Sequence, residues 1–283
     1  MRWEPGDRSN IEDRRSRSGV GVAGLGVGGF VVLLLLSWLS GTNLFSLLGT
    51  GTPGEGGAVG TSGEIRTSPA EERLVDFVDA VTNDAQDTWS QILGGRYERT
   101  RVVLFRDAIQ SACGFAEAAT GPFYCPSDRK VYLDLGFFRE LDERFGAPGD
   151  FAQAYVIAHE LGHHVQNLLG LNARAVEDRR PGANSASVAL ELQADCFAGV
   201  WGHGASRGGQ LRAGHVQLEA GDIEEALRAA AAIGDDRLQR MSTGRVMPDR
   251  FTHGTSAQRV AWFHRGMDTG DPRACSTSET TTR

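Results

Sequence analysis

The chain has 283 residues, of which 40% are hydrophobic and 23% charged, and its formal net charge is −7. These values are typical of a globular protein and argue against general disorder, and the length suits one substantial domain with appendages or two small ones. A weakly acidic chain with no basic run in its main body is a poor candidate for nucleic-acid binding, so no nucleic-acid partner is expected.

The first feature along the chain is an apolar segment, residues 19–39, that contains no charged residue. About 20 apolar residues suffice to cross a bilayer as a helix. Arg14, Arg15 and Arg17 precede this segment, and no further arginine or lysine occurs before Arg66, so the positive-inside rule places the N-terminus in the cytoplasm. The predicted organisation is a cytoplasmic tail (1–18), a single-pass transmembrane signal anchor in the cell membrane (19–39), a Gly-rich linker (40–63) and an extracytoplasmic domain (64–283).

A cleaved signal peptide is the alternative interpretation of residues 19–39, because basic residues also precede the apolar part of such peptides. That apolar part is usually about 7–15 residues long, and no A-x-A-like cleavage site follows residue 39 closely, so the uncleaved anchor is favoured. Either interpretation exports the rest of the chain. Both lead us to expect that residues 1–63 take no part in the fold.

The remaining sequence predicts a helix-dominated α+β domain with a small sheet. Ser68 and Pro69 are typical of a helix start, and this helix should run to about Leu93. Short strands are predicted at residues 101–106 and 130–134, with a loop rich in small residues between them. Further helices are expected at about residues 136–145, 151–169, 185–204, 216–232 and 256–267.

Four cysteines in an exported domain predict two disulfide bonds. Cys113 and Cys125 bracket one compact loop and are the favoured pair, which leaves Cys196 with Cys275. Two alternatives are open: some of the four are small buried hydrophobic residues, or the four thiolates bind zinc. The zinc alternative is weaker, because the spacings lack a C-x2-C pair.

An H-E-x-x-H motif occupies residues 159–163, within the predicted helix 151–169. His159 and His163 are four residues apart and lie on one face of that helix, so both imidazoles can bind one metal ion. Glu160 is rotated away from this pair, and its carboxylate can act as general base on a water that the metal activates. The alternative, a solvated helix face, is disfavoured because the residues around the motif are apolar.

A catalytic zinc ion needs a third protein ligand. The metzincin pattern requires glycine at 166 and histidine at 169, but the chain has Gln166 and Leu169, so this class is excluded. Glu191 and Asp195 share one face of the next predicted helix, among apolar neighbours. The pair resembles the E-x-x-x-D pattern of gluzincins, in which the glutamate binds zinc and the aspartate orients a ligand histidine. A surface-exposed acidic pair is the alternative.

His253 lies in the loop that leads into the last predicted helix, where its side chain could reach over the metal. There it is a candidate donor to the oxyanion that forms during peptide hydrolysis. An ordinary contact at the helix N-terminus is about as consistent with this position, because Thr255 and Ser256 already supply capping groups. The histidines that compete as ligands are His164, His203, His215 and His264.

Together with residues 121–126 and 131–134, these motifs resemble the putative neutral zinc metallopeptidase family, over roughly residues 64–276. This family comprises bacterial, membrane-associated peptidases with a zincin-type core. The resemblance implies that His159 and His163 bind Zn²⁺, that Glu160 is the catalytic glutamate and, by likeness to gluzincins, that Glu191 is the third ligand. With these roles, we expect a peptide or protein substrate.

A zincin core gives residues 131–134 a possible task, because an edge strand beside the active helix can hold an extended peptide by main-chain hydrogen bonds. A plain core strand is the safer interpretation of this segment, because the alternation of Val131 and Leu133 suits either kind of strand. Two other functions are also open: a metal-stabilised binding or scaffold protein with a degenerate protease fold, and a zinc hydrolase of non-peptide amides of the cell envelope. Intact Glu160 argues against the scaffold, because a scaffold needs the ligands but not the base.

Overall fold

The computed structural model of the chain describes residues 1–15, 67–117, 121–172, 182–207 and 211–277. The apolar segment 19–39 and the Gly-rich linker 40–63 lie outside these residues. Among the helices of the described ranges, none combines the length and the apolar character needed to span a bilayer. Residues 1–14 and residues 67–283 together form one compact unit.

The N-terminal residues are part of this unit. Strand β1 (Arg2–Trp3) pairs antiparallel with β8 (Val216–Gln217), and β2 (Ile11–Asp13) pairs in parallel with β3 (Val102–Phe105). The expectation that residues 1–63 take no part in the fold is therefore wrong for residues 1–14. Strands of two and three residues are too short to produce an alternating hydropathy pattern, so the sequence carries little sign of them.

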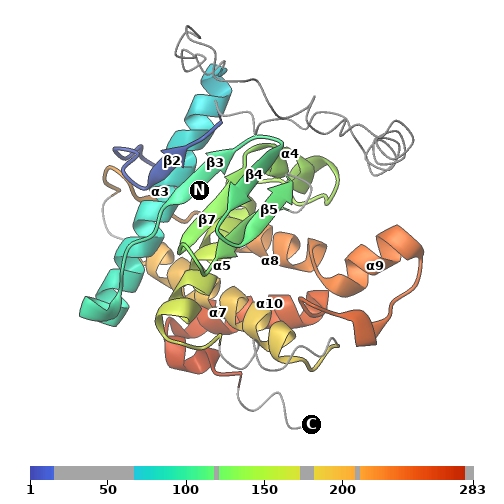
Figure 1. Cartoon of the computed structure of the whole chain (residues 1–283). Coiled ribbons are helices and arrows are strands. Elements are labelled where there is room, and N and C mark those ends of the chain that lie inside the picture. Colours follow the sequence, from blue (N-terminus) through green and yellow to red (C-terminus); the bar gives the residue numbers. More distant parts are fainter. Residues whose placement is uncertain (16–66, 118–120, 173–181, 208–210, 278–283) are drawn as a thin grey trace, which may run out of the picture. The chain divides into compact units, whose positions relative to one another are not determined.

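The main sheet has four strands in the order β2-β3-β7-β6 (Figure 1). Strand β7 (Lys130–Asp134) is parallel to β3, and β6 (Phe123–Cys125) is antiparallel to β7. Because β7 is paired on both sides, it is a core strand, and its backbone has no free edge for a peptide. The core-strand interpretation of residues 131–134 is confirmed and the possible edge-strand role is excluded; the edge beside β7 is formed by β6.

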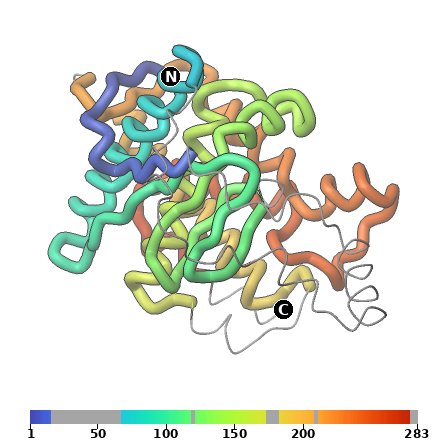
Figure 2. The backbone as a smooth tube through the Cα atoms, turned by 45° about the horizontal axis from the view of Figure 1, so that its top comes forward, coloured from blue at the N-terminus to red at the C-terminus, as the bar shows by residue number. Residues whose placement is uncertain are grey.

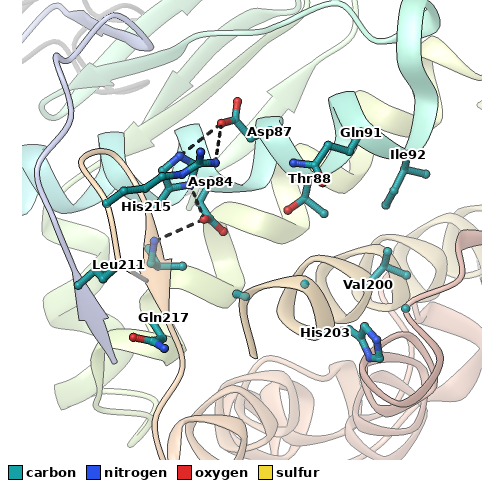
Figure 3. Close-up of a pocket in the computed structure, with 15 residues that line it drawn as sticks. Asp84, Asp87, Thr88, Gln91, Ile92, Val200, His203, Leu211, His215 and Gln217 are labelled. Atoms are coloured by element: carbon teal, nitrogen blue, oxygen red, sulfur yellow. Dashed lines mark hydrogen bonds and ion pairs between the residues drawn. The ribbon is translucent and has the colours of Figure 1, made fainter. Parts of the chain in front are cut away.

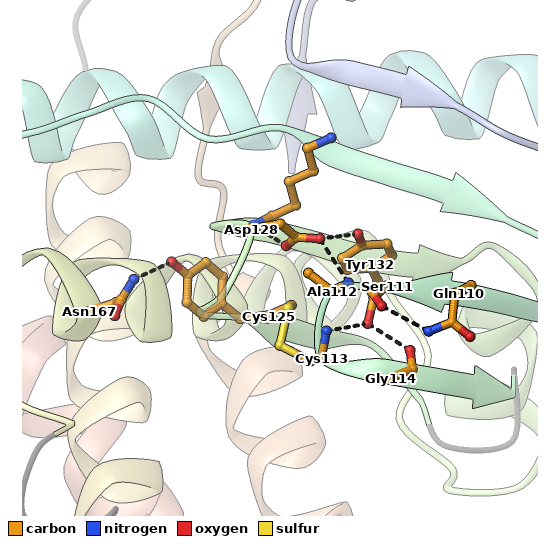
Figure 4. The surroundings of a disulfide bond; sticks show 11 residues. Gln110, Ser111, Ala112, Cys113, Gly114, Cys125, Asp128, Tyr132 and Asn167 are labelled. Carbon is orange, nitrogen blue, oxygen red and sulfur yellow. Dashed lines mark hydrogen bonds between the residues drawn. A yellow bond between two sulfur atoms is a disulfide. The ribbon is translucent and has the colours of Figure 1, made fainter.

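A small hairpin follows β3 and is tied covalently to the sheet. It consists of β4 (Ala108–Ser111) and β5 (Gly114–Glu117). Both strands lie between the strands predicted at residues 101–106 and 130–134, where the sequence analysis expected a loop. The disulfide between Cys113 and Cys125 joins the hairpin turn to the end of β6 (Figure 4). The carboxylate of Asp128 accepts hydrogen bonds from the Ala112 amide at 3.3 Å and the Tyr132 hydroxyl at 2.5 Å, which fix the turn beside β7.

Helices make up most of the remaining described structure, in agreement with the predicted α+β class (Figure 1). The first long helix begins as predicted, with the Ser68 side chain accepting from the Glu71 amide at 3.1 Å. The predicted helix 216–232 starts later than expected, because Val216 and Gln217 pair with β1. The helices are α3 (Pro69–Leu93), α4 (Gly136–Glu143), α5 (Asp150–Leu168), α7 (Ala186–Ser206), α8 (Asp222–Ala232), α9 (Asp235–Thr243) and α10 (Ser256–Thr269).

Helices α7 and α10 pack with their backbones in close contact. A Cβ atom added to Gly199 would lie 2.1 Å from the carbonyl oxygen of Phe263, and one added to Gly266 would lie 1.9 Å from that of Cys196. Cys196 also forms the second predicted disulfide, with Cys275 just beyond α10. This close packing brings the first turn of α10 against the middle of α7.

Candidate metal centre

The metal centre lies where α5 crosses α7. Gly162 permits this crossing, because a Cβ atom at that position would lie only 3.0 Å from the carbonyl oxygen of Ala194. His159, His163 and Glu191 each offer one donor atom, and these three atoms lie within 4.8 Å of one another. The structure thus brings together the three side chains that the sequence predicted as metal ligands.

The two imidazole rings are oriented so that each Nε2 faces Glu191. The Nε2 of His159 lies 3.2 Å from Oε2 of Glu191, and the Nε2 of His163 lies 3.4 Å from Oε1. Two imidazole nitrogens and one carboxylate are donors that zinc binds in three-ligand catalytic sites. The residues present therefore fit a zinc ion.

The other nitrogen of each imidazole is occupied, which fixes the orientation of the ring. Nδ1 of His159 donates to Oδ1 of Asp195 at 2.8 Å, because a carboxylate can only accept. Nδ1 of His163 lies 2.9 Å from Oε1 of Gln166, whose amide nitrogen donates to the Leu190 carbonyl at 2.7 Å. Asp195 holds the position that the gluzincin likeness implies. No role for Gln166 was expected from the sequence, where only its mismatch with the metzincin pattern was informative.

Asp195 is itself held by two residues whose part in the site the sequence did not reveal. Arg259, in the first turn of α10, donates to both carboxylate oxygens at 2.8 Å, and the Tyr155 hydroxyl donates to Oδ1 at 2.5 Å. All three side chains are buried, with Asp195 0% and Arg259 2% exposed. A buried arginine requires an acidic partner. The position of Arg259 among the apolar residues of a helix is therefore the sequence signal that could have indicated the Arg259–Asp195 ion pair.

These contacts control the charges of the metal-free centre. Burial lowers the pKa of His159, but the carboxylates of Asp195 and Glu191 outweigh it and raise that pKa to about 10. Burial opposes ionisation of Asp195, yet Arg259 and His159 bring its pKa down to about 2. Glu191 likewise has a lowered pKa in spite of burial, because both histidines face it. In the metal-free centre His159 is therefore protonated at neutral pH, and its Nε2 faces Glu191, where a metal cation would bind.

Glu160 lies beside this centre without a partner. Its side chain is buried, with 8% exposed, and within the described ranges it forms no hydrogen bond or ion pair with another residue. A buried carboxylate that is not engaged in structural bonds is available to accept a proton.

His253 lies in a loop that packs on α7 close to Glu191. A Cβ atom at Gly254 would lie 3.2 Å from the side chain of Leu192, the residue after Glu191. Asp235 accepts from the backbone amide of His253 at 2.6 Å and lies 3.3 Å from its Nδ1. The bond to Asp235 raises the pKa of His253 against the effect of burial, and the charge of Glu191 adds to the increase.

Three of the other histidines have structural partners away from the metal centre. His164 bonds the Tyr124 hydroxyl at 3.0 Å and the Glu98 carbonyl at 2.6 Å, so both of its ring nitrogens are used. His203 bonds a backbone carbonyl of α10, and His215 bonds Asp84. Both line a cavity of about 520 Å³ between α3, α7 and β8, which none of the three candidate ligands lines (Figure 3).

The sequence matches one protein family over residues 1–278, described as "Putative neutral zinc metallopeptidase". It is 45% identical to the uncharacterized protein YpfJ of Escherichia coli (strain K12) over 295 aligned residues, which cover 98% of each chain. It is 46% identical to the uncharacterized protein Rv2575 of Mycobacterium tuberculosis (strain ATCC 25618 / H37Rv) over 219 residues, which cover 76% of this chain and 74% of the relative. No solved structure matches the chain.

Proposed function

Because the chain belongs to the putative neutral zinc metallopeptidase family, we propose that it is a zinc-dependent peptidase. In this proposal His159, His163 and Glu191 hold the metal and Glu160 is the general base. The observation that carries the proposal is the meeting of three ligand atoms within 4.8 Å, beside a buried glutamate that has no other task.

The reaction adds one water molecule across a peptide bond. Zinc, when bound, would polarise the scissile carbonyl and lower the pKa of a bound water to about 7. Glu160 would accept a proton from the attacking water and return it to the leaving amine, so that the carboxylate is regenerated. Intact Glu160 favours this function over a scaffold, which requires the ligands only.

The residues behind the ligands would keep this arrangement in place. Asp195, held by Arg259 and Tyr155, would keep His159 in the tautomer that presents Nε2 to the metal. Asp235 would favour the protonated form of His253, whose imidazolium could donate to the oxyanion of the tetrahedral intermediate.

We propose β6 as the strand that holds the substrate. Within the described sheet, β6 is an outer strand with one unpaired edge. Tyr124 on β6 bonds His164 and Asn167 on α5, at 3.0 and 2.9 Å, which fixes this strand beside the motif helix. An extended peptide or protein segment could add to that edge by main-chain hydrogen bonds, as in a zincin-type domain.

We also propose that the domain works outside the cytoplasm and associates with the cell membrane through residues 19–39. The two disulfides support the first part, because such bonds persist mainly in oxidising compartments. The apolar length of residues 19–39 supports the second.

The peptidase proposal is tested on the full chain by metal analysis together with a cleavage profile on a broad peptide library. We expect about one zinc ion per chain, and we expect Glu160→Gln to keep the zinc but to lose cleavage. The exposed Glu143→Gln is the matched control and should cleave normally. Full activity of Glu160→Gln contradicts the mechanism. Zinc without peptide cleavage by the wild-type chain favours the scaffold or a non-peptide amide hydrolase.

A further inference from the structure

We infer that residues 1–14 stay attached to the mature protein and lie on the same side of the membrane as residues 67–277, so that the apolar segment 19–39 contacts the bilayer without a net crossing. The inference rests on the proposed membrane association but not on the peptidase activity.

Backbone hydrogen bonds build β2 into the main sheet. Ile11 is in register with Val102 and Asp13 with Leu104. The Val102 amide donates to the Asn10 carbonyl, and the Arg14 amide donates to the Leu104 carbonyl, each at 2.8 Å. Without β2, the backbone groups of β3 that bond to it would lose these partners and become an open edge of the sheet.

Side chains bind the same segment to α3. The guanidinium of Arg8 reaches two carboxylates of that helix, Asp76 and Glu72, each at 2.6 Å. Asp79 is completely buried, and both of its oxygens are used by the N-terminal segment: Oδ2 accepts from the Arg8 amide at 2.9 Å and Oδ1 from the Asn10 side chain at 3.2 Å. Removal of the segment would take both of these hydrogen-bond donors away from Asp79 and uncover a side chain that the fold buries.

The first residues are held at a second place in the domain. The α-amino group of Met1 donates to Asp222, the first residue of α8, at 2.9 Å. The Trp3 ring packs edge-on against Phe77 of α3, with 5.6 Å between ring centroids. Figure 2 shows the N-terminal segment in blue, lying along the cyan turns of α3. The segment is thus an integral part of the domain rather than a tail.

Both exits of the 15–66 stretch lie at one end of the sheet. Strand β2 is parallel to β3, so Asp13 ends beside Leu104. The start of α3 is close to the same end, because Glu71 in its first turn pairs with Arg106, just after β3, at 2.5 Å. The last described residues before residues 16–66 and the first ones after them therefore lie at neighbouring points of the domain.

A single crossing is incompatible with this pairing. Neighbouring strands lie about 4.8 Å apart, whereas the hydrocarbon core of a bilayer is about 30 Å thick. A signal anchor would place β2 and β3 on opposite sides of that core, and cleavage after residue 39 would remove β2 altogether. No second apolar segment of comparable length occurs between residues 40 and 66 that could carry the chain back across.

The sidedness is tested with single added cysteines in the full chain, since the four native cysteines are paired. Glu4→Cys reports on the N-terminal segment and Arg273→Cys on the domain, both at exposed positions. With a membrane-impermeant maleimide, we expect both to be labelled in right-side-out vesicles and neither in sealed inverted vesicles. Labelling of the two from opposite sides overturns the inference, as does an intact mass that lacks residues 1–14.

A second measurement tests the packing independently of any membrane. Asn10→Asp places a carboxylate against buried Asp79, whereas Ser9→Asp adds the same charge at the exposed neighbouring position. We expect Asn10→Asp to lower the Tm of the purified full chain by about 5 °C or more, and Ser9→Asp to leave it nearly unchanged. Equal Tm values for the two variants overturn the inference. Neither measurement depends on peptide cleavage, so failure here is distinct from failure of the peptidase proposal.

Discussion

Arg259 on α10 and Asp195 on α7 form a buried, two-pronged ion pair directly behind His159, with both nitrogen–oxygen distances at 2.8 Å. The carboxylate that orients the first motif histidine is thus positioned by a helix more than 60 residues further along the chain. Arg259 acts through Asp195, so its effect should be seen first in metal binding.

Arg259→Lys should weaken zinc binding by about 10–100-fold, the range found when the partners of metal ligands are changed. A lysine keeps the charge but cannot offer two parallel N–H donors to one carboxylate. Competition with a chromogenic chelator measures the affinity. Arg250→Lys, at an exposed position before the His253 loop, is the control and should bind zinc normally. Unchanged affinity in Arg259→Lys would show that Asp195 is positioned without it.

Zinc binding at pH 7 should release about one proton from His159, because a metal-binding imidazole must be deprotonated. In the metal-free protein burial lowers the pKa of His159, but Asp195 and Glu191 raise it to about 10, so the ring is protonated at neutral pH. The apparent zinc affinity should therefore rise with pH up to about 10. Titration calorimetry in two buffers of different ionisation enthalpy counts the protons, and a buffer-independent heat would contradict the prediction.

The same shift predicts how the stability of the metal-free domain depends on pH. Because the pKa of His159 is raised above its unfolded value of 6.5, its stabilising contribution is complete below that pH and is lost as pH rises towards about 10. The Tm of chelator-treated protein should fall between pH 7 and 10. Zinc-loaded protein is the control, since its His159 carries no proton to lose over this range.

Two glycines of α7 should respond in opposite ways to alanine. Gly199→Ala places a methyl group 2.1 Å from the Phe263 carbonyl oxygen, so α10 must move away, and we expect a loss of several degrees in Tm and weaker zinc binding. Gly204→Ala meets only the side chain of Thr88, at 3.5 Å, and should be neutral or stabilising by up to about 1 kcal/mol. Thermal unfolding of both variants measures the difference; equal stability would argue against close packing of α7 and α10.

Asp235→Asn should move the basic limb of the pH–rate profile to lower pH. The bond to Asp235 is the main cause of the raised pKa of His253, so removing its charge lets the imidazolium lose its proton earlier. The rate constant kcat should fall more than KM rises, because an oxyanion donor acts in the transition state. His253→Ala should abolish the effect of Asp235→Asn. A basic limb that does not move would exclude His253 as the donor.

Local features of the site could be predicted from the sequence because they depend on spacing within one helix. His159 and His163 share a face at a separation of four, and Glu191 and Asp195 do the same on the next helix. The Cys113–Cys125 pair and the start of α3 after Ser68 were also predicted from local signals, and the Cys196–Cys275 pair followed as the two remaining cysteines.

Features that depend on distant pairing could not be predicted in this way. Strand β2 has three residues and pairs with β3 some 90 positions later, so no local pattern specifies it. The alternation of Val131 and Leu133 is compatible with a core strand and with an edge strand. Only the pairing of β6 with β7 shows that this segment is a core strand. In the sequence alone, nothing identifies the partner of Arg259. Its contact with Asp195 exists only because α10 packs against α7.

The Cys196–Cys275 bond closes a stretch of 79 residues that carries Asp235, His253 and Arg259. A cross-link over such a loop contributes about 4 kcal/mol by restricting the unfolded chain. Formation of this one disulfide therefore stabilises the segment that carries all three of these side chains. Protein kept under reducing conditions would lack that link, so we expect it to bind zinc less well. With the location outside the cytoplasm that is proposed above, the bond would form only after export.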